Sequence, residues 1–138
     1  MKKTTLYLFS IFLFISINLY ADEYAVVANK NMKELSHGEI KAIFLKKIAF
    51  INDVQVVPIN LKSPNALRDS FEKNILKMSR PRLKSYWTKQ HYQGHRPPMI
   101  MNSQKSIKAF INKVDGAISY MDVKNIDESL KVLYRWSE

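Results

Sequence analysis

The sequence predicts an α/β fold, with a mostly parallel five-stranded sheet and helices on both of its faces. Two observations lead to this prediction. Segments rich in β-branched apolar residues alternate with segments whose apolar residues recur at helical spacing, as in chains built from strand–helix–strand units. In addition, the apolar strand segments show little polar alternation, which is typical of strands covered on both faces.

Residues 54–79 are predicted to form the unit that organises the rest: a buried strand, a short turn and an amphipathic helix. The β-branched residues of the strand are Val54, Val56, Val57 and Ile59. Ser63 is expected to cap the helix and Pro64 to take its first position, because proline has its φ already set and lacks an N–H that would be unpaired there. The apolar face of this helix comprises Leu67, Phe71, Ile75 and Met78.

The preceding segment supplies one strand and one helix. Residues 24–29 predict a strand inside the sheet, because their Ala-Val-Val-Ala centre carries no polar side chain. Ser36 and Glu39 have the spacing of a capping box, and the helix that they begin is predicted to bury Ile40, Ile43, Phe44 and Ile48. Residues 52–53 predict a turn, because Asn and Asp favour turn conformations.

The following segment supplies two helices and three strands. Ser79 and Pro81 predict the start of a helix that ends near His91, with Leu83, Tyr86 and Trp87 on one side. The remaining predicted elements are an irregular stretch at 93–98, a short strand at 99–101, a helix capped by Asn102-Ser103, a tight turn at 115–116, a strand at 117–121 and a final strand at 130–136.

Residues 1–21 are predicted to be a secretory signal peptide. Lys2 and Lys3 precede an apolar segment that runs from Leu6 to Leu19, and Ala21 suits cleavage. An uncleaved N-terminal anchor is the alternative. Cleavage leaves 138 − 21 = 117 residues, enough for one domain, 22–138, in the periplasm or outside the cell, without a stable membrane anchor.

The mature domain is basic and contains no cysteine. Its formal charge is 22 − 2 − 12 = +8, which favours anionic partners or surfaces. Without cysteine, disulfides and thiol chemistry are excluded. We therefore expect an ordinary packed core to provide the stability of the domain.

Several runs in the chain resemble periplasmic phosphate-binding proteins of ABC importers. The residues that carry the resemblance are Leu35-Ser36, Glu39-Ile40, Ala42-Ile43-Phe44-Leu45, Val56-Val57-Pro58, Phe71, Tyr86-Trp87, Gly94, Pro97-Pro98 and Gly116-Ala117-Ile118-Ser119-Tyr120. They match the second lobe of that type II solute-binding fold over about residues 24–120. The resemblance implies a single-lobe, phosphate-binding-like module linked to phosphate ABC transport.

The chain departs from this family at the turn that binds phosphate. In the family the turn carries an Arg, an Asp and a Ser-Gly-Thr run. Ile59 and Leu61 stand at the Arg and Asp positions, and Ser63-Pro64-Asn65 replaces Ser-Gly-Thr. The resemblance therefore implies the fold, but not tight phosphate binding.

A weak anion site is predicted at the start of the helix after the central strand. Its residues are Ser63, Asn65, Ala66 and Arg68, which offer a hydroxyl, an amide side chain, a free backbone N–H and a guanidinium. The alternative is that Ser63 only caps the helix and Arg68 is a solvated surface charge. Dimerisation would give an open lobe of this kind a second wall, so a homodimer is a further expectation.

A basic surface is predicted over residues 77–96. It comprises Lys77, Arg80, Arg82, Lys84, Lys89 and Arg96. It either docks an acidic partner or an envelope surface, or is a helix with core aromatics and solvated charges. Nucleic acid is not an expected partner of an exported protein.

The sequence contains no recognisable catalytic motif. His91 and His95 are four residues apart, but Gly94 interrupts the helix that a metal pair would need, so we expect no metal and no cofactor. The sequence therefore predicts a non-enzymatic solute-binding-type module that holds phosphate or another oxyanion weakly. The alternative is an interaction protein that uses its basic surface.

Overall fold

The computed structural model describes residues 22–138, and the predicted signal peptide lies outside the described residues. The elements in chain order are β1 Glu23–Asn29, α1 His37–Phe44, β2 Phe50–Ile51, β3 Val54–Gln55, β4 Val57–Leu61, α2 Ala66–Phe71, the π-helical turn η1 Glu72–Leu76, α3 Arg80–Tyr92, β5 Met99–Met101, α4 Gln104–Lys113, β6 Ala117–Asp122, the 3₁₀ turn η2 Val123–Asn125 and β7 Leu130–Ser137.

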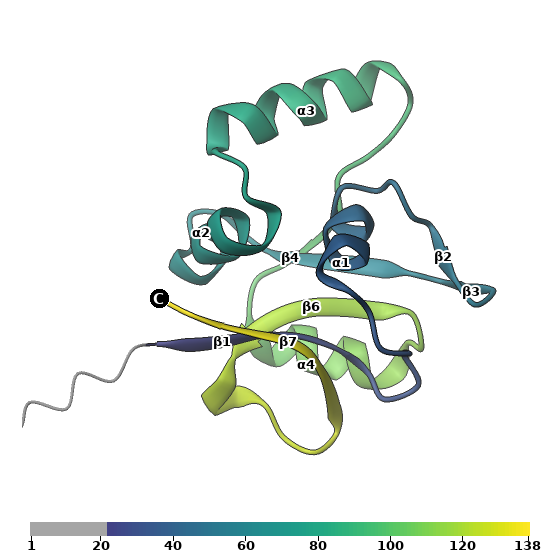
Figure 1. Cartoon of the computed structure of the whole chain (residues 1–138), viewed down its shortest axis with the longest axis vertical. Helices are drawn as coiled ribbons and strands as arrows, with labels where there is room; N and C mark the ends of the chain where they lie inside the picture. Colours follow the sequence, from purple (N-terminus) through teal and green to yellow (C-terminus); the bar gives the residue numbers. More distant parts are fainter. Residues whose placement is uncertain (1–21) are drawn as a thin grey trace, which may run out of the picture.

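The predicted α/β fold with a five-stranded sheet is confirmed. The strand order is β5-β4-β6-β1-β7 (Figure 1). The β5–β4 and β4–β6 ladders are parallel, whereas β1 pairs antiparallel with both β6 and β7. Four strands thus point the same way and β1 alone is reversed, so the sheet is mixed but mostly parallel in direction.

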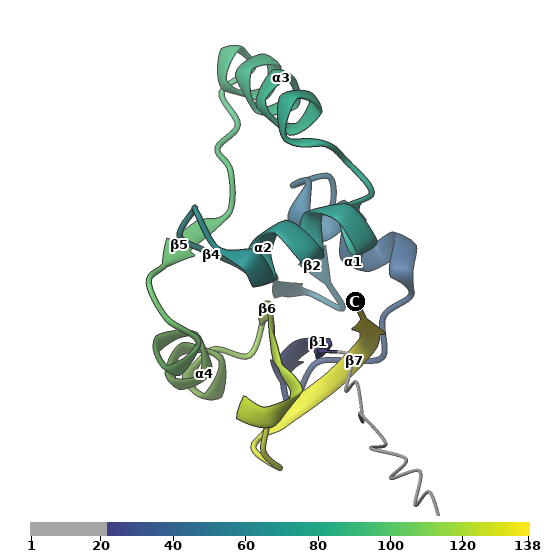
Figure 2. The same ribbon diagram turned by 90° about the vertical axis from the view of Figure 1, so that its left-hand side faces the viewer.

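Helices cover both faces of the sheet, as predicted (Figures 1 and 2). On one face Tyr120 of β6 lies against Phe44 of α1 and stacks on Phe71 of α2, with 6.1 Å and 4.1 Å between ring centroids. On the opposite face the buried Asn29 side chain of β1 donates a 2.8 Å hydrogen bond to the Ile111 carbonyl of α4. The two layers of helices therefore bury the whole central part of the sheet.

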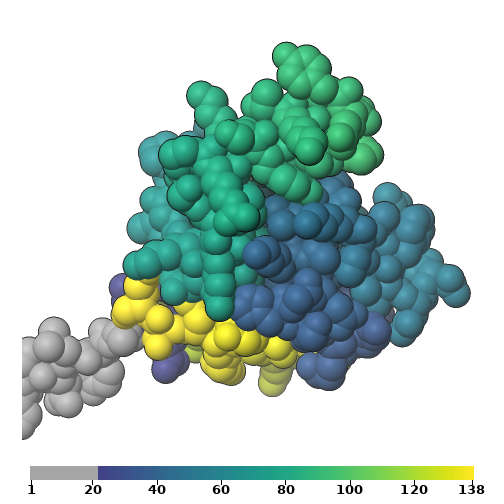
Figure 3. All heavy atoms as spheres, turned by 45° about the horizontal axis from the view of Figure 1, so that its top comes forward, coloured from purple at the N-terminus to yellow at the C-terminus, as the bar shows by residue number. Residues whose placement is uncertain are grey.

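The helix α3 is raised above this body rather than packed into it. Figure 2 shows it standing apart from the sheet, and the space-filling view shows it as a green ridge above the blue α1 region (Figure 3). Leu83 is its buried residue, and Tyr86 and Trp87 are half-buried. The Tyr86 hydroxyl donates a 2.6 Å hydrogen bond to the Leu45 carbonyl at the end of α1, which ties the helix to the body.

The caps of three helices are as predicted. Ser36 and Glu39 form the full capping box of α1, Ser79 caps α3, and Ser103 caps α4. These caps depend only on residues within the same turn, which is why spacing in the sequence predicts them.

The predicted helix start at Ser63-Pro64 is wrong. The helix α2 begins at Ala66 and its N-cap is Asn65, whose side chain accepts from the Arg68 N–H. Asn is as good an N-cap as Ser, so local preference alone did not discriminate between the two positions. The loop from Lys62 to Asn65 carries the chain out of the sheet before the helix starts.

The single buried strand predicted from Val54 is also wrong in its first part. Asn52 and Asp53 adopt positive φ, and the turn that they form joins β2 to β3 in a separate hairpin. Val54 is 40% exposed there, because its β-branched side chain belongs to that hairpin. The buried strand of the main sheet is β4, from Val57.

Candidate functional site

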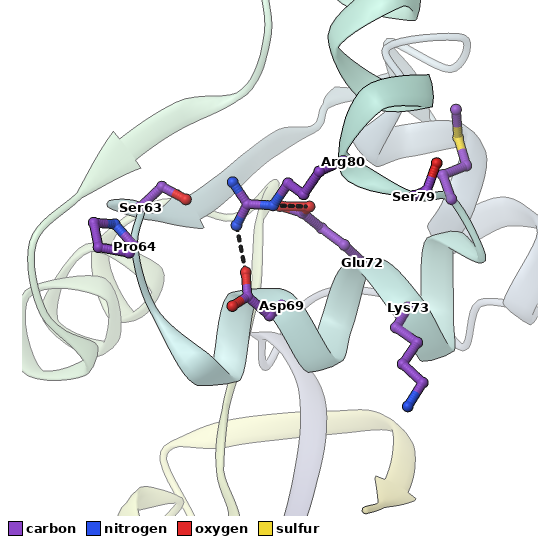
Figure 4. Close-up of a pocket in the computed structure, with 8 residues that line it drawn as sticks. Ser63, Pro64, Asp69, Glu72, Lys73, Ser79 and Arg80 are labelled. Atoms are coloured by element: carbon purple, nitrogen blue, oxygen red, sulfur yellow. Dashed lines mark hydrogen bonds and ion pairs between the residues drawn. The ribbon is translucent and has the colours of Figure 1, made fainter.

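The predicted anion site lies on the connection between β4 and α2. This connection leaves the carboxyl end of a parallel strand, the position at which open α/β sheets bind ligands. A hollow of about 370 Å³ opens here (Figure 4). Its lining residues are Ser63, Pro64, Asp69, Glu72, Lys73, Met78, Ser79 and Arg80.

Ser63 contributes a hydroxyl to this hollow. Its Oγ is buried and has no hydrogen-bond partner among residues 22–138. Asn65 is occupied, since its Oδ1 caps α2 at 3.0 Å from the Arg68 N–H. The Ala66 N–H is the first of the helix and makes no hydrogen bond within the described part of the chain. Two donors, one hydroxyl and one amide, are therefore unused near the start of α2.

The Arg68 side chain does not point into this hollow. Its Nε donates to Glu72 at 2.9 Å and one terminal nitrogen donates to the Leu61 carbonyl at 2.9 Å. The side chain is only 19% exposed. Arg68 therefore links the end of β4 to Glu72 and stabilises the β4–α2 connection, rather than acting as a solvated surface charge.

Arg80 is the cation that the structure brings to the hollow in place of Arg68. Ser63 and Arg80 lie on opposite sides of it (Figure 4). Arg80 pairs with Asp69, and its Nε lies 2.9 Å from Oε2 of Glu72, a contact too bent for a hydrogen bond. An anion bound here would compete with two carboxylates for this guanidinium, which limits the affinity that Arg80 can provide.

The predicted basic surface divides over the two sides of α3. Arg82 and Lys89 line a hollow of about 360 Å³ between α3 and α1, together with Lys41 and Lys47. Lys84 lines a different and larger groove. Lys77 at the end of η1 and Arg96 in the loop after α3 are exposed. Within the described chain, Arg80 is the member of the predicted set that makes ion pairs.

Sequence reasoning missed two contributors to these surfaces. Lys41 and Lys47 come from α1 and the turn after it, 35 or more positions before Arg82 in the chain. Lys46 and Lys47 follow the end of α1, where positive charge suits a helix C-terminus, but the docking of Tyr86 onto Leu45 is what places Lys47 next to α3.

No metal or membrane-spanning feature occurs in the part of the chain that the structure describes. Over residues 22–138, no three potential metal-ligating side chains from His, Cys, Asp and Glu are grouped together. His95 Nδ1 instead lies 2.7 Å from Gln90 Oε1. None of the described helices is long and apolar enough to cross a bilayer.

The fold is shared with solved phosphate receptors. An ABC-type phosphate transport receptor from Vibrio cholerae aligns with a TM-score of 0.63 and 18% identity, over 81% of this chain and 45% of that one. A protein described as a phosphate ABC transporter substrate-binding protein, with bound phosphate, from Clostridium perfringens aligns with a TM-score of 0.64 and 23% identity, over 81% and 44%. PstS from Borrelia burgdorferi aligns with a TM-score of 0.58 and 11% identity, over 82% and 47%.

The fold is that of one lobe of a phosphate receptor. The chain spans less than half the length of these three structures. By sequence, no family model and no curated protein matches it. The resemblance seen in the sequence is therefore confirmed at the level of fold.

Proposed function

We propose that this chain is an exported, non-enzymatic solute-binding-type domain that holds phosphate or another oxyanion weakly and serves phosphate ABC transport. The observation that carries the proposal is the pair of unused donors at the carboxyl end of β4, the Ser63 hydroxyl and the Ala66 N–H. They lie on a fold shared with a solved structure that has bound phosphate. The described residues 22–138 form the domain, and residues 1–21 direct export.

Weak binding is expected because few donors are available. Each hydrogen bond to a charged group contributes about 1.5–3 kcal/mol, and Arg80 is shared with Asp69 and Glu72. Two such bonds correspond to a millimolar dissociation constant, near 4 kcal/mol. A second copy of the domain closing over the hollow would add donors and raise the affinity.

Titration calorimetry with phosphate and with sulfate tests this function. Ala66→Pro removes the N–H at the first helical position, where proline is well tolerated, and Ala66→Gly is the matched control that keeps it. We expect millimolar binding to the wild type and to Ala66→Gly, and binding at least about tenfold weaker to Ala66→Pro. Absence of heat and of any thermal shift at millimolar anion would remove the proposal.

Two further measurements test export and assembly. N-terminal sequencing of the protein recovered from outside the cytoplasm should begin at or within two residues of Asp22. Sedimentation with and without phosphate should show a phosphate-dependent increase in dimer if a second copy closes the site. A constant monomer in both conditions rules out the dimer but leaves the anion titration as the test of binding.

The second candidate function is docking of an acidic envelope protein. The observation in its favour is the hollow between α1 and α3, which is lined by four cations and, in the structure as described, by no carboxylate. Because Arg80 is already paired, charge reversal belongs at Arg82 and Lys89. Arg82→Glu with Lys89→Glu should abolish salt-sensitive docking and leave the phosphate titration unchanged. Docking that persists in high salt and after reversal would exclude this function.

A further inference from the structure

A groove of about 710 Å³ separates α3 from the body of the domain, on the side away from Arg82 and Lys89. Its size lies within the range of small-molecule sites, roughly 300–1,000 Å³. Asn60, the residue before the last of β4, reaches it. The groove thus lies beside the carboxyl end of a parallel strand, where α/β sheets hold ligands.

The floor of the groove is apolar. Phe44, Leu76 and Leu83 line it, and each is less than 10% exposed. Trp87 lines it too and is half-buried, so its ring is available to a ligand while packing edge-on against Tyr86 at 4.9 Å between centroids. Such a surface favours the apolar part of a ligand, because contact removes that part from water.

The carboxylate that borders the groove is paired with two guanidinium groups. Glu72 is 5% exposed, and its two oxygens lie 2.9 Å from Nε of Arg68 and 2.9 Å from Nε of Arg80. Its negative charge is therefore offset by two guanidinium groups, although its Oε2 accepts no hydrogen bond among residues 22–138. The row of ion-paired side chains Arg68, Glu72 and Arg80 also separates this groove from the hollow at Ser63.

Apart from Oε2 of Glu72, which faces Arg80, the side-chain groups of the groove that lack a partner among residues 22–138 are donors. Asn60 Oδ1 accepts a 2.9 Å hydrogen bond from the Tyr120 hydroxyl. The amide NH2 group of Asn60 has no partner among residues 22–138. Among the residues that the structure describes, Lys84 has no carboxylate within 4.0 Å, and the Trp87 Nε1–H donates no hydrogen bond. A ligand that satisfies this set must bring acceptors and negative charge.

We propose that this groove binds a small organic anion with an apolar body, of the aryl or medium-chain alkyl carboxylate class. The apolar body lies on Phe44, Leu83 and Trp87, and the carboxylate accepts from Asn60 and pairs with Lys84. Inorganic phosphate has no part that would use the apolar floor. The inference is independent of the anion site at Ser63 and goes beyond it.

Calorimetry on the described domain with 4-phenylbutyrate tests the proposal, with the neutral 4-phenylbutan-1-ol as the matched ligand. We expect saturable binding of one 4-phenylbutyrate per domain and at least about tenfold weaker binding of the alcohol, because one charge-assisted bond is worth that much. Equal binding of acid and alcohol, or no saturation with either, would overturn the proposal. A parallel titration with inorganic phosphate reports only on the Ser63 site, so either site can fail while the other holds.

Two substitutions identify where the acid binds. Lys84→Gln should weaken 4-phenylbutyrate binding at least about threefold. Lys89→Gln should not, because Lys89 is an exposed lysine on the other side of the same helix. Asn60→Asp keeps the oxygen that accepts from Tyr120 but replaces the amide NH2 group by a second carboxylate oxygen. The new negative charge should weaken 4-phenylbutyrate binding at least about tenfold. Thermal unfolding of each variant checks that it is folded. Equal losses at Lys84 and Lys89 would show general charge attraction and refute the site.

Discussion

Replacing Tyr120 by phenylalanine should lower the free energy of unfolding by about 1–3 kcal/mol. The Tyr120 side chain is fully buried. Its hydroxyl accepts a 3.1 Å hydrogen bond from the Leu61 N–H and donates a 2.9 Å bond to Asn60. Phenylalanine keeps the ring that stacks on Phe71, so the change isolates the hydroxyl.

The magnitude follows from the group that is left behind. Leu61 is 1% exposed, so its N–H has no water to replace the lost acceptor, and an unsatisfied buried donor costs about 1–3 kcal/mol. Asn60 is half-buried, so water can hydrate its carbonyl oxygen and this second loss adds little. The expected total therefore remains within the same range.

Urea denaturation followed by circular dichroism measures the effect, with Tyr134→Phe as the matched control. Tyr134 is 37% exposed and its hydroxyl makes no hydrogen bond to the residues described, so we expect a change within about 0.5 kcal/mol. The comparison requires equal m-values, because a changed slope would signal a changed unfolded or native state. If Tyr120→Phe were as stable as Tyr134→Phe, the argument from the buried Leu61 N–H would be refuted.

Alkaline pH gives an independent reading of the same group. Burial raises the pKa of Tyr120 above the ordinary tyrosine value, so the unfolded chain loses this proton at lower pH than the folded domain does. The contribution to stability is complete below about pH 10 and is lost as the pH rises above it. Burial also raises the pKa of Tyr24 and of Tyr86. In Tyr120→Phe the alkaline decline should therefore become shallower without disappearing.

Three further changes test other parts of the fold by the same denaturation assay. Gly116→Ala would place a Cβ 1.8 Å from the Gln55 carbonyl oxygen and should cost more than about 3 kcal/mol. In Gly38→Ala the new Cβ would meet only the Ser36 Oγ, 3.9 Å away at the N-cap of α1, so this change should stabilise by about 0.5–1 kcal/mol. Similar effects at both positions would contradict the close approach at Gly116. Ser36→Ala should cost about 1 kcal/mol through loss of the α1 cap, and a neutral result would mean that the cap is not formed. Glu72→Gln should cost roughly 3 kcal/mol, since it leaves two guanidinium groups without their shared carboxylate; an unchanged midpoint would show that the pair contributes no net stability.

The sequence alone was sufficient for the elements whose signals are local. The capping box of α1 and the serine caps of α3 and α4 depend on side chains within one turn of the helix, and each of the five strands of the sheet overlaps a predicted strand segment. Where two local signals were equally good, the prediction failed: Ser63 and Asn65 are both favourable caps, and the chain uses Asn65.

The candidate sites were only partly predictable, because their residues meet through tertiary packing. Arg68 was expected at the anion site. Its side chain instead donates hydrogen bonds to Glu72, one helical turn later, and to the Leu61 carbonyl. Arg80 was predicted to belong to the basic surface over residues 77–96, but the turn before α3 brings it to Asp69 and Glu72. The Arg68–Glu72 pair has the i, i+4 spacing of neighbours on one helix face, whereas no such spacing relates Arg80 to Asp69 or Glu72.

The sequence by itself determined that the chain forms an α/β lobe, because strand and helix periodicities and caps act over a few residues. Tertiary structure decided which polar groups are left unused. The height of α3 above the sheet creates the groove at Asn60 and Lys84 and the separate hollow at Arg82 and Lys89. The physical reason is that a donor is available to a ligand only when the folded chain has not already paired it, and pairing is a property of three-dimensional neighbours.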